Sequence, residues 1–315
     1  MLKAYLVFNP AAGRFPSRIL TERAASVLRK RDWDVSIIQT IGGPHITELA
    51  LQAVDQGMDA FFLAGGDGSI NFAVAGLVNS ETPLGVLPAG TANVWSQELG
   101  LPGLTWTRLM ALEESAHQLV NGTIRKVDVG YCNKAPFLLW AGVGLDAFIV
   151  HRVEPRNRWE KHFAIAHYAS IAMKQASFWG GINLKVTIDD EEISGHYILG
   201  VVSNIHLYAG GFAEISPYAC LDDGVMDLWL FAGETLMETL HHAWNLWSGR
   251  HLDSDQVQCV PFRNLHLSSD SHMFVQVDGE PLNEVGDITI DVRPQALRVI
   301  VPSNAPQALF TEVQD

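Results

Sequence analysis

The chain has 315 residues, of which 48% are hydrophobic, and it carries a formal net charge of −14. This length exceeds what one compact α/β core needs and fits two domains of ordinary size. The negative charge argues against a nucleic-acid-binding protein, which would normally present a basic face, and against strong attraction of the whole molecule to anionic lipid. A local basic patch could still form at Arg152, Arg156, Arg158 and Lys161.

Neither a membrane span nor a secretory leader is visible in the sequence. No apolar run approaches the roughly 20 residues needed to cross a bilayer, and the apolar run at the start is too short for a signal peptide. The three cysteines, Cys132, Cys220 and Cys259, are widely spaced, so neither a disulfide framework nor a cysteine zinc site is supported. We therefore expect a cytoplasmic protein.

The first half of the chain alternates apolar runs with amphipathic segments. Strands are expected at 3–8, 35–38, 60–64 and 84–87, and helices at about 17–32, 44–56 and 69–79. The run at 60–64 is apolar throughout, as in a strand that is buried on both faces. Ser17 is expected to cap the first helix and Gly57 to end the second. This alternation predicts an α/β domain with a doubly wound parallel sheet.

The second half is dominated by short strands and predicts a β-sandwich with helical excursions. Two helices are expected, near 159–177 and 235–247, and Asp189-Asp190 is expected to form a turn. The change in character predicts domains at 1–128 and 129–292, with 293–315 packing back on the first domain. The expected strands are 137–141, 182–188, 196–203, 225–231, 273–278, 287–292 and 297–301.

The strongest motif is Gly65-Gly66-Asp67-Gly68-Ser69-Ile70-Asn71, which stands where an apolar strand ends and a helix begins. Glycines let the backbone turn tightly and approach a ligand, and the N–H groups of a helix start can bind an anion. A plain strand-to-helix turn would use the same residues. A carboxylate in a phosphate loop favours phosphoryl transfer, where a cation or a hydroxyl proton must be handled. The motif is neither a Walker A loop nor a dinucleotide fingerprint.

Two further loops follow neighbouring strands. Gly90 and Thr91 belong to PLGVLPAGTAN at 83–93, and Asn9 opens NPAAG at 9–13. Because the carboxyl ends of parallel strands meet at one edge of a sheet, all three loops are expected to face the same crevice. Alternatively, Thr91 could merely cap the following helix, and Asn9-Pro10 could merely open a turn.

Acidic residues cluster at two turns in the second half. Asp222-Asp223-Gly224 precedes the strand expected at 225–231, and Asp278-Gly279-Glu280 follows the strand at 273–278. Taken alone, both segments are explained as hairpin turns, because Asp-Gly pairs are abundant there. Their oxygen atoms, with those of Asp67 and Asp227, would also suit Mg²⁺.

Taken together, these segments resemble the diacylglycerol kinase catalytic-domain family, which includes bacterial lipid kinases and the sphingosine and ceramide kinases. The resemblance extends over DVG at 128–130, AGVGLDA at 141–147, SN at 203–204, YAGG at 208–211, LDDGVMD at 221–227 and VDGEP at 277–281. It implies an ATP-binding α/β domain and a β-sandwich domain with the active site in the cleft between them.

The resemblance also implies roles for single residues. The aspartate Asp223, with the backbone carbonyls of Cys220 and Val225, matches a Mg²⁺ site. Glu280 matches the proposed proton acceptor, and Asp278 and Asp67 match acidic positions close to the reacting phosphate. The positions that match nucleotide contacts are Asn9, Thr40, Gly65, Gly66, Asp67, Gly68, Ser69, Asn71, Gly90 and Thr91.

The activity implied is transfer of the γ-phosphate of ATP to a lipid hydroxyl, with diacylglycerol converted to phosphatidic acid as the leading expectation. The lipid would be met at a membrane surface by transient peripheral contact, a homodimer is left open, and no nucleic acid is expected. Phe72 and Val94 stand where many members carry Glu and Asp. An NAD kinase-like enzyme and a non-catalytic relative that binds nucleotide or lipid are the alternatives.

Overall fold

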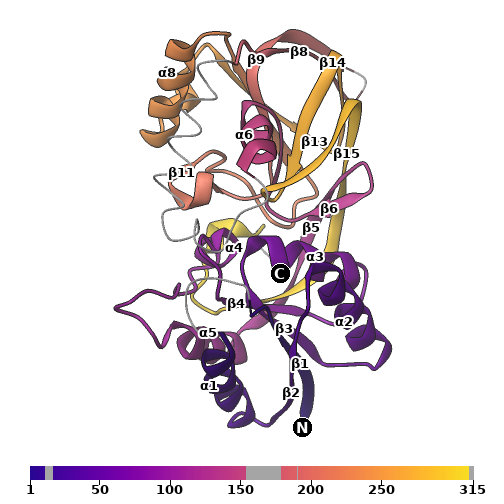
Figure 1. Ribbon diagram of the computed structural model, residues 1–315, viewed down its shortest axis with the longest axis vertical. Helices are drawn as coiled ribbons and strands as arrows, with labels where there is room; N and C mark the ends of the chain where they lie inside the picture. Colours follow the sequence, from indigo (N-terminus) through magenta and orange to yellow (C-terminus); the bar gives the residue numbers. More distant parts are fainter. Residues whose placement is uncertain (11–16, 154–178, 190, 312–315) are drawn as a thin grey trace. The chain divides into compact units, whose positions relative to one another are not determined.

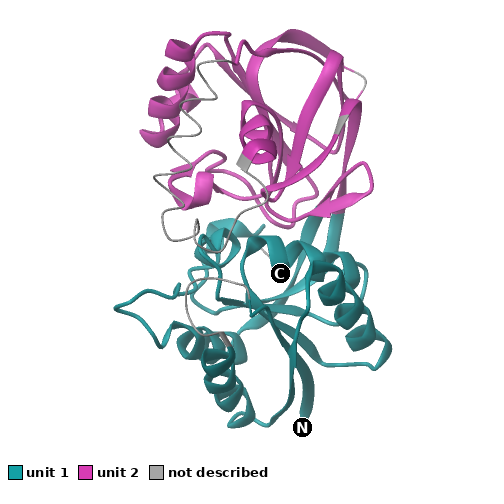
Figure 2. Ribbon diagram, in the orientation of Figure 1, with its two compact units in different colours: residues 1–129, 294–315 teal, residues 130–293 magenta. Residues whose placement is uncertain are grey.

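The computed structural model describes residues 1–10, 17–153, 179–189 and 191–311 (Figure 1). The chain folds into two compact units (Figure 2). Unit 1 comprises Met1–Val129 and Pro294–Asp315, and unit 2 comprises Gly130–Arg293. The boundaries expected from the sequence, after residues 128 and 292, each lie one residue before these.

Unit 1 contains a parallel sheet in the order β15-β4-β3-β1-β2. Every residue of β3 is buried, as its apolar sequence predicts. Helix α1 packs beside α5, and α2 packs beside α3, and these two pairs flank the strands (Figure 1). The expectation of a doubly wound α/β domain is therefore confirmed.

The elements of unit 1 follow the expected alternation closely. Helix α2 ends at Asp55, and Gly57 adopts a φ of 63° just after it, which is the conformation that glycine favours at a helix end. The elements are β1 (Leu2–Phe8), α1 (Ser17–Arg29), β2 (Trp33–Gln39), α2 (Gly43–Asp55), β3 (Ala60–Gly65), α3 (Asp67–Leu77), β4 (Leu84–Pro88), α4 (Val94–Glu98), α5 (Ala111–Val120) and the greater part of β5 (Thr123–Cys132).

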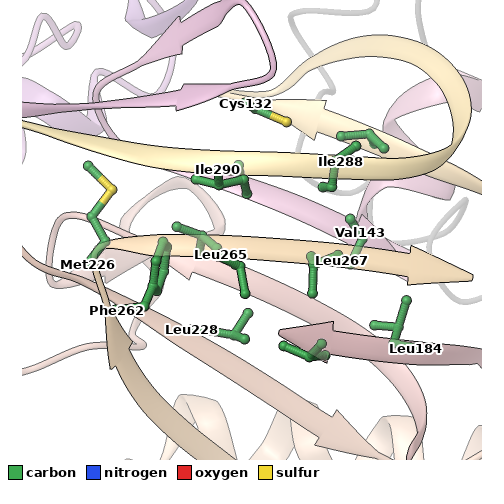
Figure 3. Packing of buried hydrophobic residues seen from close by; sticks show 14 of the residues in the cluster. Cys132, Val143, Leu184, Met226, Leu228, Phe262, Leu265, Leu267, Ile288 and Ile290 are labelled. Carbon is green, nitrogen blue, oxygen red and sulfur yellow. The ribbon is translucent and has the colours of Figure 1, made fainter. Parts of the chain in front are cut away.

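Unit 2 is built from antiparallel strands that bend around a hydrophobic core, with a smaller cluster beside α6. Strand β9 pairs with β8 through residues 191–197 and with β7 through residues 199–203, and β14 likewise pairs first with β8 and then with β7. The core includes Val143, Leu184, Leu228, Leu265 and Ile290 (Figure 3). This arrangement confirms the expected β-sandwich.

The elements of unit 2 include two helices among the described residues. Helix α6 lies against β14 and β7, and α8 begins with a capping box formed by Thr235 and Glu238. The elements are β6 (Ala135–Phe137), β7 (Trp140–Gly144), α6 (Leu145–Val153), β8 (Ile182–Ile188), β9 (Glu191–Ser203), β10 (Leu207–Tyr208), β11 (Ala213–Glu214), β12 (Met226–Ala232), α8 (Leu236–Trp247), β13 (Val257–Phe262), β14 (Asn264–Val277) and β15 (Glu280–Val301).

Some expectations for the second half were wrong. The strand expected at 137–141 is two strands, because β6 ends at Phe137 and β7 begins at Trp140. The strands expected at 287–292 and 297–301 are one strand, β15, which passes from unit 2 into unit 1 at Pro294. The helix expected at 159–177, Asp190, and the basic residues Arg156, Arg158 and Lys161 lie outside the described residues.

Candidate functional site

The two glycine-rich loops of unit 1 touch through their backbones. A Cβ atom on Gly90 would lie 2.5 Å from the Cα atom of Gly66, and a Cβ atom on Gly66 would lie 3.0 Å from the Cα atom of Gly90. Real Cβ atoms do not approach other atoms as closely as 2.5 Å, so Gly90 must lack a side chain for the loops to meet. The amide of Ala89 also donates to the carbonyl of Gly65, at 3.0 Å. The sequence-based expectation that these loops share one edge is confirmed for this pair.

The carboxylate of Asp67 joins the same two loops. Its oxygens accept hydrogen bonds from the backbone amides of Val94, at 3.0 Å, and Trp95, at 3.1 Å, in the first turn of α4. Burial raises the pKa of the Asp67 carboxyl, and the amide hydrogen bonds act in the opposite direction. Asp67 therefore fixes the position of the second loop, which the sequence did not predict. Its place beside a reacting phosphate stays a prediction.

Asn93 shapes the second loop. It adopts a left-handed conformation with a φ of 55°, and its side chain accepts from the amide of Gly90 at 2.7 Å and donates to the carbonyl of Gly90 at 3.1 Å. Asn93 is also the residue before α4, so the interpretation of Thr91 as the helix cap was wrong. Thr91 is exposed instead. Asn93 was quoted in the PAGTAN motif, but no role was assigned to it.

The other residues expected to contact nucleotide differ in whether their side chains already make hydrogen bonds within the protein. Asn9 donates to the hydroxyl of Ser69 at 3.4 Å, which brings the end of β1 to the start of α3. The hydroxyl of Thr40 is buried and bonded to the backbone of Gly42. The side-chain oxygen of Asn71 is buried and has no hydrogen-bond partner within the described ranges. Asn71 is therefore the candidate with an unused acceptor.

In unit 2, Asp278 and Gly279 form a two-residue hairpin turn between β14 and β15. Val277 pairs with Glu280, and the φ angles of the two turn residues are 47° and 80°, as a type I′ turn requires. The hairpin interpretation is thus confirmed. It leaves Glu280 exposed at the first position of β15.

The carboxylate of Asp278 is buried and bound to the backbone of a distant segment. It accepts hydrogen bonds from the amides of Leu138, at 2.9 Å, Leu139, at 3.0 Å, and Trp140, at 2.9 Å. These amides turn toward Asp278 instead of toward a neighbouring strand, which explains why β6 and β7 are separate strands. Both oxygens of Asp278 are used in this way, and Asp278 is buried, whereas Glu280 is an exposed residue.

The acidic segment at 222–227 has the electrostatic character of a cation site. Loss of hydration, together with the negative charges of Asp227 and Asp222, raises the pKa of Asp223, against a hydrogen bond from the amide of Val225. Asp227 is bonded to the hydroxyl of Ser216, which also accepts from the indole of Trp229. Within the described ranges, no three His, Cys, Asp or Glu side chains lie together as a metal cluster. The Mg²⁺ site that the resemblance implies, formed by Asp223 and the backbone carbonyls of Cys220 and Val225, stays a prediction.

The structure adds residues to the Asp278–Glu280 turn that the sequence did not single out. Gln276 accepts from the amide of Gly279 and donates to Asp146, which is also hydrogen-bonded to Tyr208. Asp146 and Tyr208 were quoted in motifs without a role, and Gln276 carried no signal because it lies within an expected strand, one residue before the end of β14. None of the helices in the described part of the chain has the length and apolar character needed to cross a bilayer.

Comparison with known proteins places both units. The diacylglycerol kinase catalytic domain matches residues 3–132, and the YegS C-terminal NAD kinase beta sandwich-like domain matches residues 140–301. The chain is 26% identical over 285 residues to the diacylglycerol kinase of Bacillus subtilis, covering 89% of this chain and 90% of that protein. It is 27% identical over 311 residues to the diacylglycerol kinase of Mycobacterium tuberculosis, covering 95% of each.

Solved structures share the fold. A crystal structure of a diacylglycerol kinase from Bacillus anthracis superimposes with a TM-score of 0.73 at 20% identity, covering 96% of this chain and 98% of that chain. The likeness extends over both units, in agreement with the two domain matches. The chain belongs to the diacylglycerol kinase catalytic-domain family.

Proposed function

We propose that this protein is an ATP-dependent lipid kinase that phosphorylates the hydroxyl of diacylglycerol to give phosphatidic acid. The observation that carries the proposal is the joined pair of glycine-rich loops, in which Gly66 contacts Gly90 and Asp67 binds the amides of Val94 and Trp95. Membership of this family implies that the protein is a kinase that uses ATP as co-substrate. The relatives named diacylglycerol kinase favour this acceptor among lipids.

In this proposal, the two joined glycine-rich loops hold ATP and the Asp278–Glu280 turn serves the acceptor. The acceptor oxygen forms a bond to the γ-phosphorus, the bond from that phosphorus to the bridging oxygen breaks, and ADP leaves. The proton of the hydroxyl passes to Glu280, which is an exposed residue, whereas the carboxylate of the buried Asp278 accepts hydrogen bonds from three amides. Phosphoryl transfer depends chiefly on positioning and charge neutralisation. Loops that are held in place by direct contacts can provide the positioning.

Mg²⁺ is the cation that this chemistry calls for, since it neutralises charge on the transferred phosphate. The residues that would hold it are Asp223 and the backbone carbonyls of Cys220 and Val225. All three supply oxygen, which Mg²⁺ prefers. Burial, and to a smaller extent the negative charges of Asp227 and Asp222, raise the pKa of Asp223, and a divalent cation would offset those charges, so the donor set fits.

A lipid acceptor is supported by the surface of α8. This helix turns its polar residues His242 and Asn245 inward and exposes an apolar stripe. Trp244 and Trp247 are 57% and 64% exposed and their rings lie 5.1 Å apart. Tryptophan rings favour the interface between water and lipid. We propose that this stripe, which also includes Met237 and Leu240, gives the enzyme transient contact with a membrane surface.

The second candidate is phosphorylation of NAD, favoured by one observation, the match of unit 2 to an NAD kinase beta sandwich-like domain. Radiolabelled ATP offered with diacylglycerol, sphingosine, phosphatidylglycerol and NAD separates the candidates. Label in phosphatidic acid supports the proposal, and label in NADP overturns it in favour of the second candidate. Nucleotide binding with no transfer to any acceptor would point to a non-catalytic relative.

A further inference from the structure

A series of partly buried hydrogen bonds leads from Asp146 in α6 to the turn that carries Glu280. The carboxylate of Asp146 accepts from the side-chain amide of Gln276 at 2.8 Å, and the side-chain oxygen of Gln276 accepts from the backbone amide of Gly279 at 2.8 Å. Gln276 is completely buried. Gly279 is the residue immediately before Glu280, so the series ends at the backbone of the turn itself.

The hydrogen bond between Asp146 and Gln276 requires a glycine at position 142. Gly142 lies opposite Gln276 on the neighbouring strand β7. A Cβ atom at position 142 would lie 2.5 Å from Oδ2 of Asp146 and 2.7 Å from Nε2 of Gln276. The Asp146–Gln276 pair therefore occupies the space that any other residue at 142 would fill.

Further contacts hold this series of hydrogen bonds at the Asp146 end. Tyr208 hydrogen-bonds to Asp146, and the ring of Tyr208 packs edge-on against Trp140 at 5.6 Å. The amide of Trp140 in turn donates to Asp278. Burial raises the pKa of Asp146, against the hydrogen bonds from Tyr208 and Gln276. Keeping a carboxylate in such surroundings is costly, which argues for a function beyond packing.

We propose that Asp146 and Gln276 are positioning residues, which hold the Gly279 amide so that the carboxylate of Glu280 points in one direction. The inference rests on the proposed function for its catalytic meaning. A proton acceptor must be held to a fraction of an ångström by residues that support it from behind. Asp278 anchors one side of this turn and Gln276 the other.

The test compares Asp146→Ala and Gln276→Leu with the conservative variant Asp146→Asn, which keeps an oxygen for Gln276. With diacylglycerol in mixed micelles, Asp146→Ala and Gln276→Leu should lower kcat by about 10²-fold, with an unchanged KM for ATP, because a misplaced group costs roughly this factor. Asp146→Asn should retain most of the activity. The control Gln258→Leu, at an exposed position of β13, should behave as wild type.

Gln276→Glu gives a sharper test because it preserves shape. The carboxyl group introduced by this substitution can donate to Asp146 and accept from Gly279 while it is protonated, whereas its ionised form cannot donate. The ratio of variant to wild-type kcat should therefore be highest at low pH. It should fall as pH rises, because the proton that the introduced carboxyl group shares with Asp146 is then lost. A ratio that is independent of pH, or equal losses in Asp146→Asn and Asp146→Ala, would overturn the inference.

Hydrogen exchange at the Gly279 amide separates this inference from the proposed function. Exchange there should be faster in Gln276→Leu and Asp146→Ala than in wild type and Asp146→Asn, whatever the acceptor is. Unchanged exchange in all variants would refute the positioning role. If exchange changes as expected but wild type phosphorylates no lipid, the positioning role stands and the proposed function fails.

Discussion

Gly90 and Gly66 lie so close that the loops carrying them can meet only while Gly90 has no side chain. We expect Gly90→Ala to lower the free energy of unfolding by about 1–3 kcal/mol, as overpacking does, and to weaken ATP binding by spreading the loops. Calorimetry and nucleotide titration measure both effects. The matched control is Gly103→Ala, where a Cβ atom would meet nothing within 4 Å. Equal behaviour of the two variants would refute the close contact.

Asp67→Asn should reduce turnover by at least about 10²-fold while the protein remains folded. An asparagine can offer an oxygen to only one of the amides of Val94 and Trp95 and presents an N–H group to the other. The second loop then shifts, at a cost on the order of 1–3 kcal/mol in stability. Asp34→Asn, at an exposed position of β2, is the control. Near-normal turnover in folded Asp67→Asn would remove this residue from the mechanism.

Mg²⁺ should stabilise the protein through Asp223, and the effect should depend on pH. A carboxyl group whose pKa is raised on folding binds its proton more tightly in the folded state. In EDTA the free energy of unfolding should therefore fall as pH rises from the ordinary aspartate pKa through the raised one. Added Mg²⁺ should reverse this loss at neutral pH, by about 2.7 kcal/mol at a concentration of 100 Kd, and do little at low pH.

Asp223→Ala should lose both activity and the Mg²⁺-dependent rise in Tm, and EDTA should mimic this variant. In EDTA the variant should be no less stable than wild type, because the substitution also removes a repulsive charge near Asp222 and Asp227. Asp270→Ala, at an exposed position of β14, serves as the control. A full Mg²⁺ response in Asp223→Ala would show that the cation binds elsewhere.

Glu280→Gln should cut kcat by roughly 10²–10⁴, the usual range for general acid–base catalysis, with little change in the KM for ATP. Asp278→Asn should instead affect the stability of the fold. It keeps only one acceptor oxygen for the three amides of Leu138–Trp140 and presents an N–H group in place of the other, so it should destabilise unit 2 by about 1–3 kcal/mol. Pre-steady-state transfer to one lipid compares the two. If Glu280→Gln reacts at the wild-type rate and folded Asp278→Asn does not, Asp278 is the base.

Replacing Trp244 and Trp247 by Ala should lower binding to lipid vesicles and turnover of vesicle-borne diacylglycerol, since two large rings leave the lipid interface. Turnover of a short-chain, monomeric diacylglycerol should change little. Trp106→Ala is the matched control, because Trp106 is 75% exposed but lies in unit 1. Vesicle sedimentation measures the binding. Loss of vesicle binding in Trp106→Ala and not in the double variant would contradict the assignment to α8.

The sequence predicts unit 1 well because its signals are local. An apolar run such as residues 60–64 and a glycine such as Gly57 determine where a strand forms and where a helix ends, and the structure agrees at both places. The meeting of the Gly66 and Gly90 loops follows equally from the rule that parallel strands end at one edge.

The contacts around the Asp278–Glu280 turn could not be predicted from local signals. The interruption between β6 and β7 depends on Asp278, which is 140 residues away from Leu138 in the chain. Gln276 reads as an ordinary strand residue until Gly142 and Asp146 are seen beside it. Likewise, the left-handed conformation of Asn93 is fixed by its bonds to Gly90, and a sequence pattern does not specify it.

Strand β15 has a consequence for how the protein is made. The segment that pairs with β4, near Val299, is synthesised only after the whole of unit 2. Until then the β4 edge of the parallel sheet of unit 1 has no neighbour, and unpaired edges invite aggregation. A fragment that ends at Val129 should therefore be poorly soluble, and adding the Pro294–Thr311 peptide in trans should improve its solubility.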